Sequence, residues 1–248
     1  MATVDVAASY RSPRVGGDYF EFIHVAPSRL LLVLLDVAGS AAQAMPITAA
    51  VQEFVHKFGP KIFAGQDGNE ADAIAEMTLL LNRTVLAAAG AVCHTPAFIA
   101  SYNDSVGVLT YINAGHTPGL LRHGEKVELL PANGVPLGLF SHSTHDAQMA
   151  ALAPGSTVLL VSRGLVEFRR GRTEFGLERL RNHLTSSTTR EAAKLCKEVL
   201  DQVSHFAAST DSGVLGKILQ VTRADRFEND VTAVVLARYA AAASVGSS

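Results

Sequence analysis

The stretch Val15–Ser40 constrains the fold more than any other, because it combines two apolar strands with two aspartates. Tyr19–Val25 is rich in aromatic and β-branched residues, and Arg29–Leu35 is apolar on both faces, so together they predict a hairpin with a buried second strand. Asp18 follows two glycines before the first strand, and Asp36 ends the second. A carboxylate at the end of a buried strand is costly unless a positive group meets it. The two aspartates therefore predict a shared cation.

The rest of the chain changes between helical and strand periodicity in blocks. Apolar residues at helical spacing predict a helix over Ile47–Phe58, stopped by Gly59-Pro60, and a second helix capped by Asn69. Further segments predict strands: Val4–Ser12, Phe98–Tyr102, Val108–Ala114, Gly119–Arg122, Lys126–Leu130, Gln148–Leu152, Thr157–Val161 and Val231–Leu236. Leu177–Leu184 and Arg190–Phe206 predict two late helices. Runs of strands and runs of helices favour an α+β fold with antiparallel sheets and helices outside.

Composition narrows the classes of protein that fit. The chain has 248 residues, of which 48% are hydrophobic and 18% charged, and these values suit one domain over residues 1–239 with a disordered tail of small residues over 240–248. The net charge of −2 and the lack of a basic block argue against nucleic-acid binding. No apolar run approaches the ~20 residues of a membrane helix, and no secretory signal is present. Cys93 and Cys196 suit reduced thiols, so we expect a cytoplasmic protein without membrane contact.

Seven short motifs, in order along the chain, resemble those of the PPM family of metal-dependent protein serine/threonine phosphatases. The similarity is greatest to the bacterial branch typified by the sporulation stage II protein E phosphatase (SpoIIE). The motifs are Val15-Gly16-Gly17-Asp18-Tyr19, Asp36-Val37-Ala38-Gly39, Tyr111-Ile112-Asn113-Ala114-Gly115-His116, Gly134-Val135-Pro136-Leu137-Gly138, Pro154-Gly155-Ser156, Glu174-Phe175-Gly176 and Asn229-Asp230-Val231-Thr232. Because they span nearly the whole chain in the family's order, chance is a poor explanation.

This resemblance implies a β-sandwich of two antiparallel sheets flanked by pairs of antiparallel helices, with a Mg²⁺ or Mn²⁺ site at one end. It implies that Asp36 is the bridging, catalytic carboxylate, and that Asp18 and the Val37 carbonyl complete the shell of one metal. Carboxylate and carbonyl oxygens are the ligands that such hard cations prefer. The implied reaction is hydrolysis of phosphoserine or phosphothreonine on a regulatory protein such as an anti-sigma antagonist.

Two positions depart from the family pattern, and both concern the second metal. Where the family has a Thr-Asp-Gly turn, this chain has Ser162-Arg163-Gly164, so an arginine replaces a carboxylate. Where the family has the first aspartate of a pair, this chain has Asn229 followed by Asp230. Asp230 can substitute only if the last strand begins after it, because adjacent strand residues face opposite sides. The sequence therefore favours one bound ion rather than two.

Three interpretations of Arg163 stay open at this level. In the first, the chain is a one-metal phosphatase and Arg163 binds the substrate phosphate, for which a guanidinium fork is well suited. In the second, the chain is a catalytically inactive pseudophosphatase that serves as a protein-binding or adaptor module in bacterial signalling. In the third, Arg163 forms a salt bridge with Asp36 or Asp18 and the site is structural. Whether the chain is an enzyme is left undecided by the sequence.

We expect structural roles for the polar residues outside the proposed metal site. His116 follows Asn113-Ala114-Gly115, and we expect a hydrogen-bonded structural histidine there rather than a general acid. Asn113 is expected to close the same loop, and Ser40 to cap the helix that follows it. Cys196 shares a helix with Leu195 and Val199, so burial is expected for its thiol.

Overall fold

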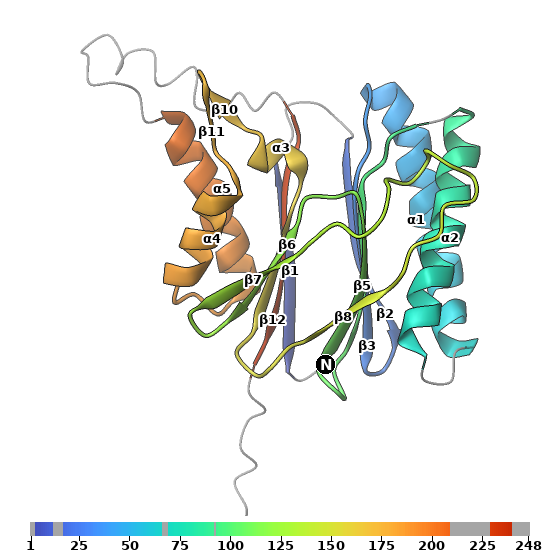
Figure 1. Cartoon of the computed structure of the whole chain (residues 1–248), viewed down its shortest axis with the longest axis horizontal. Coiled ribbons are helices and arrows are strands. Elements are labelled where there is room, and N and C mark those ends of the chain that lie inside the picture. The colour runs from blue at the N-terminus through green and yellow to red at the C-terminus, as the bar shows by residue number, and fades with distance from the viewer. Residues whose placement is uncertain (1–2, 12–16, 66–68, 92, 209–228, 240–248) are drawn as a thin grey trace, which may run out of the picture.

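Two antiparallel five-stranded sheets lie face to face, and a pair of helices covers the outer face of each sheet (Figure 1). The computed structural model describes residues 3–11, 17–65, 69–91, 93–208 and 229–239. This four-layered α+β arrangement confirms the predicted sandwich. The predicted tail at 240–248 lies outside the described residues, as do Val15 and Gly16 of the first motif. None of the described helices is long and apolar enough to cross a bilayer.

The chain passes between the two sheets several times, with β2 to β5 consecutive in one sheet and β6 and β7 consecutive in the other. The first sheet has the order β1-β12-β9-β6-β7, made of β1 (Val4–Arg11), β12 (Val231–Arg238), β9 (Thr157–Val161), β6 (Gly119–His123) and β7 (Lys126–Leu130). The second has the order β2-β3-β4-β5-β8, made of β2 (Asp18–Ala26), β3 (Arg29–Asp36), β4 (Ala97–Asn103), β5 (Val108–Ala114) and β8 (Gln148–Ala151). The strand at Val4–Arg11 lies at the edge of its sheet, and its partner β12 comes from the far end of the chain.

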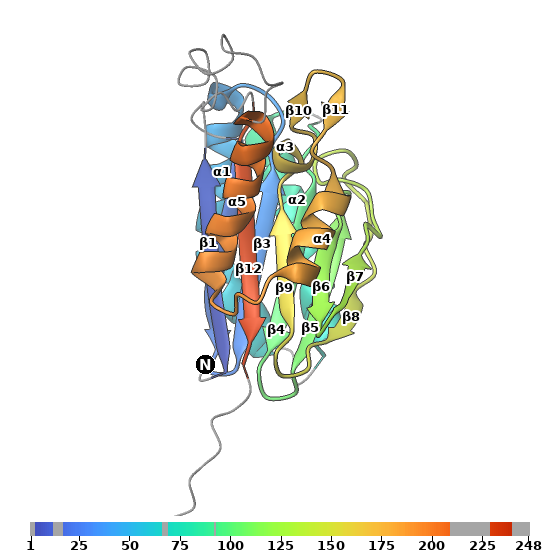
Figure 2. The ribbon, with the colours of Figure 1, turned by 90° about the vertical axis from the view of Figure 1, so that its left-hand side faces the viewer.

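The helices form one pair on each side of the sandwich. Helices α1 (Ala41–Gly65) and α2 (Glu70–Ala89) cover the second sheet, and α4 (Leu177–Ser186) and α5 (Ala192–Ala208) cover the first (Figure 2). A short helix, α3 (Arg163–Val166), and a small hairpin of β10 (Arg169–Arg170) and β11 (Thr173–Glu174) follow β9. These short elements are absent from the sequence prediction, because two to four residues carry no measurable periodicity.

Three apolar layers hold the four structural layers together. Leu30, Leu32 and Leu34 point between the sheets, whereas Leu31 and Leu35 point toward α1 and α2. This alternation explains why the whole strand is apolar, since each of its faces meets a different core. The first sheet repeats the pattern, with Val234 and Leu236 facing inward, and with other residues of β12 facing α4 and α5.

The first helix is longer than its sequence predicts. We expected a helix over Ile47–Phe58 that ends at Gly59-Pro60, but α1 runs from Ala41 to Gly65 with Pro46 and Pro60 inside. The carbonyls that lose a partner belong to Ala42 and His56, which are exposed, so water can replace the missing hydrogen bonds. Gly59 is buried against the second sheet, and a Cβ there would lie 3.3 Å from Leu31 Cδ2. The glycine thus permits close packing and does not end the helix.

Candidate metal centre

A cleft of about 380 Å³ opens at the end of the sandwich where β2, β3, β9 and β12 meet α1 and α3. Its described lining carries four carboxylates and one arginine: Asp18, Asp36, Glu167, Asp230 and Arg163. The remaining lining residues are small or polar, and they include Val37, Gly39, Ser40 and Asn229. An excess of acidic groups around an open space favours a cation over a bare anion.

One wall of the cleft comes from the second sheet, and we call it the β2–β3 wall (Gly17, Asp18, Asp36 and Val37). Asp18 and Asp36 are direct partners in the antiparallel register of β2 and β3. The Val37 N–H donates to the Gly17 carbonyl over 2.8 Å, and the Asp36 N–H donates to the Pro96 carbonyl over 2.9 Å. The backbone of this wall is therefore fixed on both sides, which holds the two carboxylates next to each other.

The opposite wall comes from the first sheet, and we call it the β9–β12 wall (Arg163, Gly164, Asn229 and Asp230). The Ser162 N–H donates to the Thr232 carbonyl over 3.0 Å, and the Thr232 N–H donates to Ser162 Oγ over 3.0 Å. These bonds tie the turn after β9 to the start of β12. Since β12 begins at Val231, Asp230 precedes the strand and lines the cleft, which meets the condition set by the sequence.

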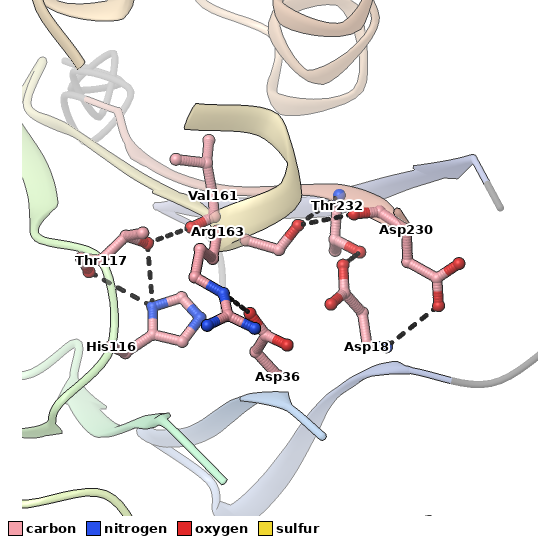
Figure 3. A network of polar contacts seen from close by, with 9 residues as sticks. Asp18, Asp36, His116, Thr117, Val161, Arg163, Asp230 and Thr232 are labelled. Atoms are coloured by element: carbon pink, nitrogen blue, oxygen red, sulfur yellow. Dashed lines mark hydrogen bonds and ion pairs between the residues drawn. The ribbon is translucent and has the colours of Figure 1, made fainter. Parts of the chain in front are cut away.

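Hydrogen bonds join the two walls across the cleft (Figure 3). Thr232 Oγ1 donates to Asp18 Oδ2 over 2.6 Å, and the Asp18 N–H donates to Asp230 Oδ2 over 3.2 Å. The Tyr10 hydroxyl donates to the same Asp230 oxygen over 3.1 Å. Gly17 permits this approach, because a Cβ there would lie 2.8 Å from Asp230 Oδ2. Asp230 thus stands beside the β2–β3 wall even though it belongs to the opposite one.

Arg163 forms an ion pair with Asp36, and this contact is one of the alternatives left open by the sequence. Arg163 Nε lies 3.2 Å from Asp36 Oδ2, and Figure 3 shows the guanidinium extending from α3 over the carboxylate. The Arg163 side chain is 43% exposed, whereas the Asp36 side chain is 12% exposed. Among the described residues, no hydrogen bond occupies the two terminal nitrogens of Arg163. The arginine therefore has donors left for a ligand in the cleft.

Both aspartates of the β2–β3 wall have a raised pKa, so their environment favours the protonated, neutral form. The pKa of Asp18 is raised to about 7, chiefly by burial and also by the nearby Asp36 and Asp230, against the lowering effect of hydrogen bonds from Thr232 and Ser162. Burial also raises the pKa of Asp36, although the Arg163 guanidinium lowers it. A bound divalent cation would favour the ionised form of both carboxylates.

His116 lies beside Arg163 but is held by its own loop (Figure 3). The His116 N–H donates to Asn113 Oδ1 over 2.8 Å, which confirms the loop-closing role predicted for Asn113. Thr117 donates its hydroxyl hydrogen to the Val161 carbonyl, so Thr117 Oγ1 is left to accept from His116 Nδ1 at 3.1 Å. This assigns the proton to Nδ1. Burial lowers the pKa of His116 to about 4, and the ring is neutral near pH 7.

The donor set contains oxygen ligands of the kind that a hard cation prefers. Asp18, Asp36 and the Val37 carbonyl supply oxygen ligands along one wall, and the raised pKa of Asp18 marks a buried carboxylate without a paired cation. Among the described residues, no three acidic, histidine or cysteine side chains are arranged to hold an ion together. At the second metal position Arg163 brings a positive charge to Asp36, and Asn229 brings a neutral amide. Asp230 and Glu167 are the carboxylates that line the cleft on this side.

The sequence interpretation missed three residues of this site. Glu167 lines the cleft four residues after Arg163, and its charge raises the pKa of Asp36. Only recognition of α3 as a helix would have placed Glu167 on the same face as Arg163. Thr232 lies within a motif and Ser162 beside one, but their hydrogen bonds to Asp18 and β12 depend on tertiary structure.

Ser40 directly precedes α1. Gln43 Oε1 accepts from the Ser40 N–H over 2.8 Å, which is half of a capping box.

Solved structures share this fold. The chain aligns over 97% of its length with the RsbU and RsbW domains of a Mycobacterium tuberculosis protein, at 23% identity and a TM-score of 0.71, but spans only 63% of that chain. It covers 96% of the SpoIIE phosphatase domain from Bacillus subtilis, and 99% of this chain aligns, at 16% identity and a TM-score of 0.66. The catalytic domain of the serine/threonine phosphatase PstP in complex with two manganese ions aligns with 96% of this chain over its whole length, at 14% identity and a TM-score of 0.60.

Sequence comparison gives the family. No curated protein sequence matches the chain significantly. The family model described as stage II sporulation protein E (SpoIIE) matches residues 26–238, and this match includes Asp36, Val37, Arg163, Asn229 and Asp230. Because the model covers most of the chain, and because the fold is that of the PPM phosphatases, the assignment rests on both sequence and structure. The chain belongs to the SpoIIE family of PPM-type phosphatases.

Proposed function

We propose that this chain is a metal-dependent phosphatase that removes phosphate from serine or threonine on a regulatory partner protein, with one bound ion and an arginine in place of the second. The observation that carries this proposal is the cleft itself. It sets the Asp18–Asp36 pair and the Val37 carbonyl on one wall against Arg163, whose terminal nitrogens face no described partner, on the other.

The ion would be Mg²⁺ or Mn²⁺, held by Asp18, Asp36 and the Val37 carbonyl. When bound, such an ion lowers the pKa of a coordinated water and so supplies a nucleophile near neutral pH. The chain itself supplies the orientation of the substrate. Arg163 can turn from Asp36 to the non-bridging oxygens of a phosphate, because its side chain is only partly buried and a guanidinium binds two such oxygens at once.

The start of α1 supports phosphate binding on the same side. Ala38, Gly39, Ser40 and Ala41 line the cleft, and the N–H groups in the first turn of a long helix carry partial positive charge. The first turn holds no acidic residue that would compete for this charge. Arg163 and the helix start thus approach a phosphate from two directions, while the acidic wall holds the cation.

The substrate class follows from relatives and is part of the proposal. One similar structure combines RsbU and RsbW domains in a single chain, which supports a regulatory protein partner in signalling. An anti-sigma antagonist that carries phosphoserine or phosphothreonine is a partner of this kind.

The Arg163–Asp36 ion pair favours a second candidate, a pseudophosphatase. A fixed positive charge near 4 Å from a metal position opposes metal binding, and Asp36 is the carboxylate that two metals would share. In this alternative the fold binds a phosphorylated partner as an adaptor without hydrolysing it. Arg163 and the helix start keep the same phosphate-binding role in both candidates.

The two candidates separate in a turnover assay with p-nitrophenyl phosphate over a range of Mn²⁺ and Mg²⁺ concentrations. The phosphatase proposal predicts turnover that depends on the metal and disappears in Asp36→Asn. Asp146→Asn is a matched control, because Asp146 is exposed and lies outside the cleft lining. Absence of turnover at every metal concentration would reject the phosphatase and leave the adaptor.

A further inference from the structure

A second depression lies beside the cleft and shares Asp18 with it. This groove of about 420 Å³ runs between the outer edge of β2 and helix α1, and we call it the β2 groove. Its lining residues are Tyr10, Asp18, Tyr19, Phe20, Glu21, Met45, Thr48, Ala49 and Gln52. Since Asp18 borders both spaces, a chain bound in the cleft can continue directly into the groove.

The groove exposes an unpaired strand edge. β2 is the outermost strand of its sheet, and no described strand pairs with its outer side. The Val37 N–H bonds the Gly17 carbonyl, and Asp18 is opposite Asp36, so odd-numbered residues of β2 direct their backbone groups toward β3. Even-numbered residues must direct theirs outward. The Phe20 N–H and carbonyl therefore face the groove.

Side chains of the protein occupy the outward groups on each side of Phe20. The Asp18 N–H donates to Asp230 Oδ2 over 3.2 Å, and the Phe22 N–H donates to Glu21 Oε1 over 3.2 Å. These contacts confirm the alternation and leave the Phe20 N–H as the open donor between two occupied ones. An edge with unsatisfied groups beside an apolar surface is a template for one more strand.

The surface around this edge is apolar and acidic. Met45 is 55% exposed and Tyr10 is 39% exposed, although both are large apolar or aromatic residues. Asp18 and Glu21 are the charged residues of its described lining, which contains no lysine, arginine or histidine, and Glu21 Oε2 also lies 3.0 Å from His56 Nε2 on α1. The Tyr19 hydroxyl is buried without a hydrogen-bond partner among the described residues. An occupant that complements this surface carries apolar side chains and a basic one.

We infer that the β2 groove binds an extended segment of the partner protein, the residues that immediately precede its phosphorylated serine or threonine, as an added antiparallel strand on β2. This inference rests on the proposed recognition of a phosphorylated partner. β2 runs away from the cleft, so an antiparallel segment runs toward it and ends at the phosphorylated residue. Phe20 lies two residues, about 7 Å, from Asp18. The second residue before the phosphorylated one, position −2, therefore pairs with Phe20.

The alternation of side chains assigns a preference to each position. A side chain at −2 falls on the same face as Phe20, beside Tyr10, and an apolar residue fits there. A side chain at −1 faces α1 near Tyr19 and Met45, and is also apolar. A side chain at −3 is opposite Glu21, and a lysine fits there.

The probe is a fluorescein-labelled peptide with Lys-Val-Val before a non-hydrolysable phosphonate analogue of phosphoserine, and its affinity is measured by fluorescence anisotropy. The matched control places the same residues after the phosphonate in reverse order. We expect the control to bind about tenfold more weakly. N-methylation of the backbone at −2 should weaken binding about fivefold, because it removes a hydrogen bond to Phe20, whereas N-methylation at −1 should have little effect.

A pair of variants tests the protein side. Met45→Glu should weaken the Lys-Val-Val peptide about tenfold, and Met149→Glu should not, since Met149 is 63% exposed on β8 and lies outside the groove. p-Nitrophenyl phosphate is too small to reach the groove, so its turnover tests the proposed phosphatase activity independently of peptide binding in the groove. If that turnover is absent while the peptides still discriminate, the groove inference stands and the phosphatase proposal fails. Equal affinity for both peptide orders, equal effects of both N-methylations, or equal effects of both glutamates would overturn the inference.

Discussion

The two walls of the cleft are built alike but carry different chemistry. On the β2–β3 wall, two aspartates face each other at the ends of paired strands, and both have a raised pKa. On the β9–β12 wall, the corresponding turn carries Arg163 and the start of β12 carries Asn229. The backbone hydrogen bonds of Ser162 and Thr232 keep the second wall as ordered as the first. The two walls thus differ in charge, since the β2–β3 wall carries two carboxylates and the β9–β12 wall carries Arg163 together with Asp230.

The shape of this site and its charge are therefore separable. Among the described lining residues of the cleft only Val37 belongs to the apolar layers of the sandwich, so we expect substitutions of the charged lining residues to leave the fold intact. We also expect the charge of each wall to determine how many cations the site holds. Four sets of measurements test this difference between the walls, in decreasing order of expected effect.

Asp36→Asn should reduce metal-dependent turnover by about 100-fold or more, because it removes an ionised ligand from the wall that is expected to hold the ion. The measurement is steady-state hydrolysis of p-nitrophenyl phosphate with saturating Mn²⁺. Circular dichroism should show an unchanged fold. Retention of most of the activity would show that the β2–β3 wall does not carry the chemistry.

The pH dependence of stability should report the buried charge of Asp18. Its pKa is about 7 in the folded protein, above the ordinary value near 4, so the folded state keeps a proton that the unfolded chain releases between these values. In EDTA the free energy of unfolding should therefore fall as pH rises from about 4 to about 7, by at most roughly 1.4 kcal/mol per pH unit. Urea titrations at several pH values measure this slope, and Asp18→Asn should flatten it. A slope that survives the substitution would assign the effect to other groups.

Two glycine substitutions compare how rigid the walls are. In Gly164→Ala the new Cβ would lie 2.2 Å from the Asp230 carbonyl oxygen, so the backbone must move, at a cost of roughly 1–3 kcal/mol in stability. In Gly17→Ala the new Cβ would meet a carboxylate oxygen of Asp230 at 2.8 Å, and that side chain can rotate away. The second substitution should therefore cost less than the first, as measured by urea unfolding. The reverse order would contradict the geometry described for Asp230.

Arg163→Gln should have the smallest effect on stability, below about 1 kcal/mol, because the Arg163 side chain is 43% exposed and such ion pairs contribute little. Its effect on metal binding should be larger and opposite in sign, since removal of the positive charge strengthens Mn²⁺ binding at Asp36. Arg163→Lys keeps the charge and serves as the control. Unchanged Mn²⁺ affinity in Arg163→Gln would show that the ion pair does not oppose the metal.

Much of the fold can be predicted from the sequence because its strands and helices carry strong periodic patterns. The strands at Val108–Ala114, Lys126–Leu130 and Thr157–Val161 have the predicted bounds. The prediction failed at Gly59-Pro60, where packing against Leu31 overrides the usual effect of these residues. Local sequence cannot reveal such a contact between distant segments.

Some residues of the candidate site can be predicted from the sequence, and others depend on contacts between distant segments. Asp18 and Asp36 stand out in the sequence because charged residues at the ends of apolar strands are unusual, and the register of β2 and β3 brings them together. The ion pair of Arg163 was only one of three alternatives, since nothing local specifies which carboxylate it meets. Glu167 and Thr232 enter the site through α3 and through β12, which adjoins β9 from far along the chain.

The number of Mn²⁺ ions bound by the unmodified protein distinguishes a one-ion site from a two-ion site. Isothermal titration calorimetry should give one ion per chain, because only the β2–β3 wall offers a suitable set of ligands. The double variant Arg163→Asp with Asn229→Asp, which restores carboxylates to the β9–β12 wall, should bind two. Two ions in the unmodified protein would contradict the account, because they would show that Arg163 does not exclude the second metal.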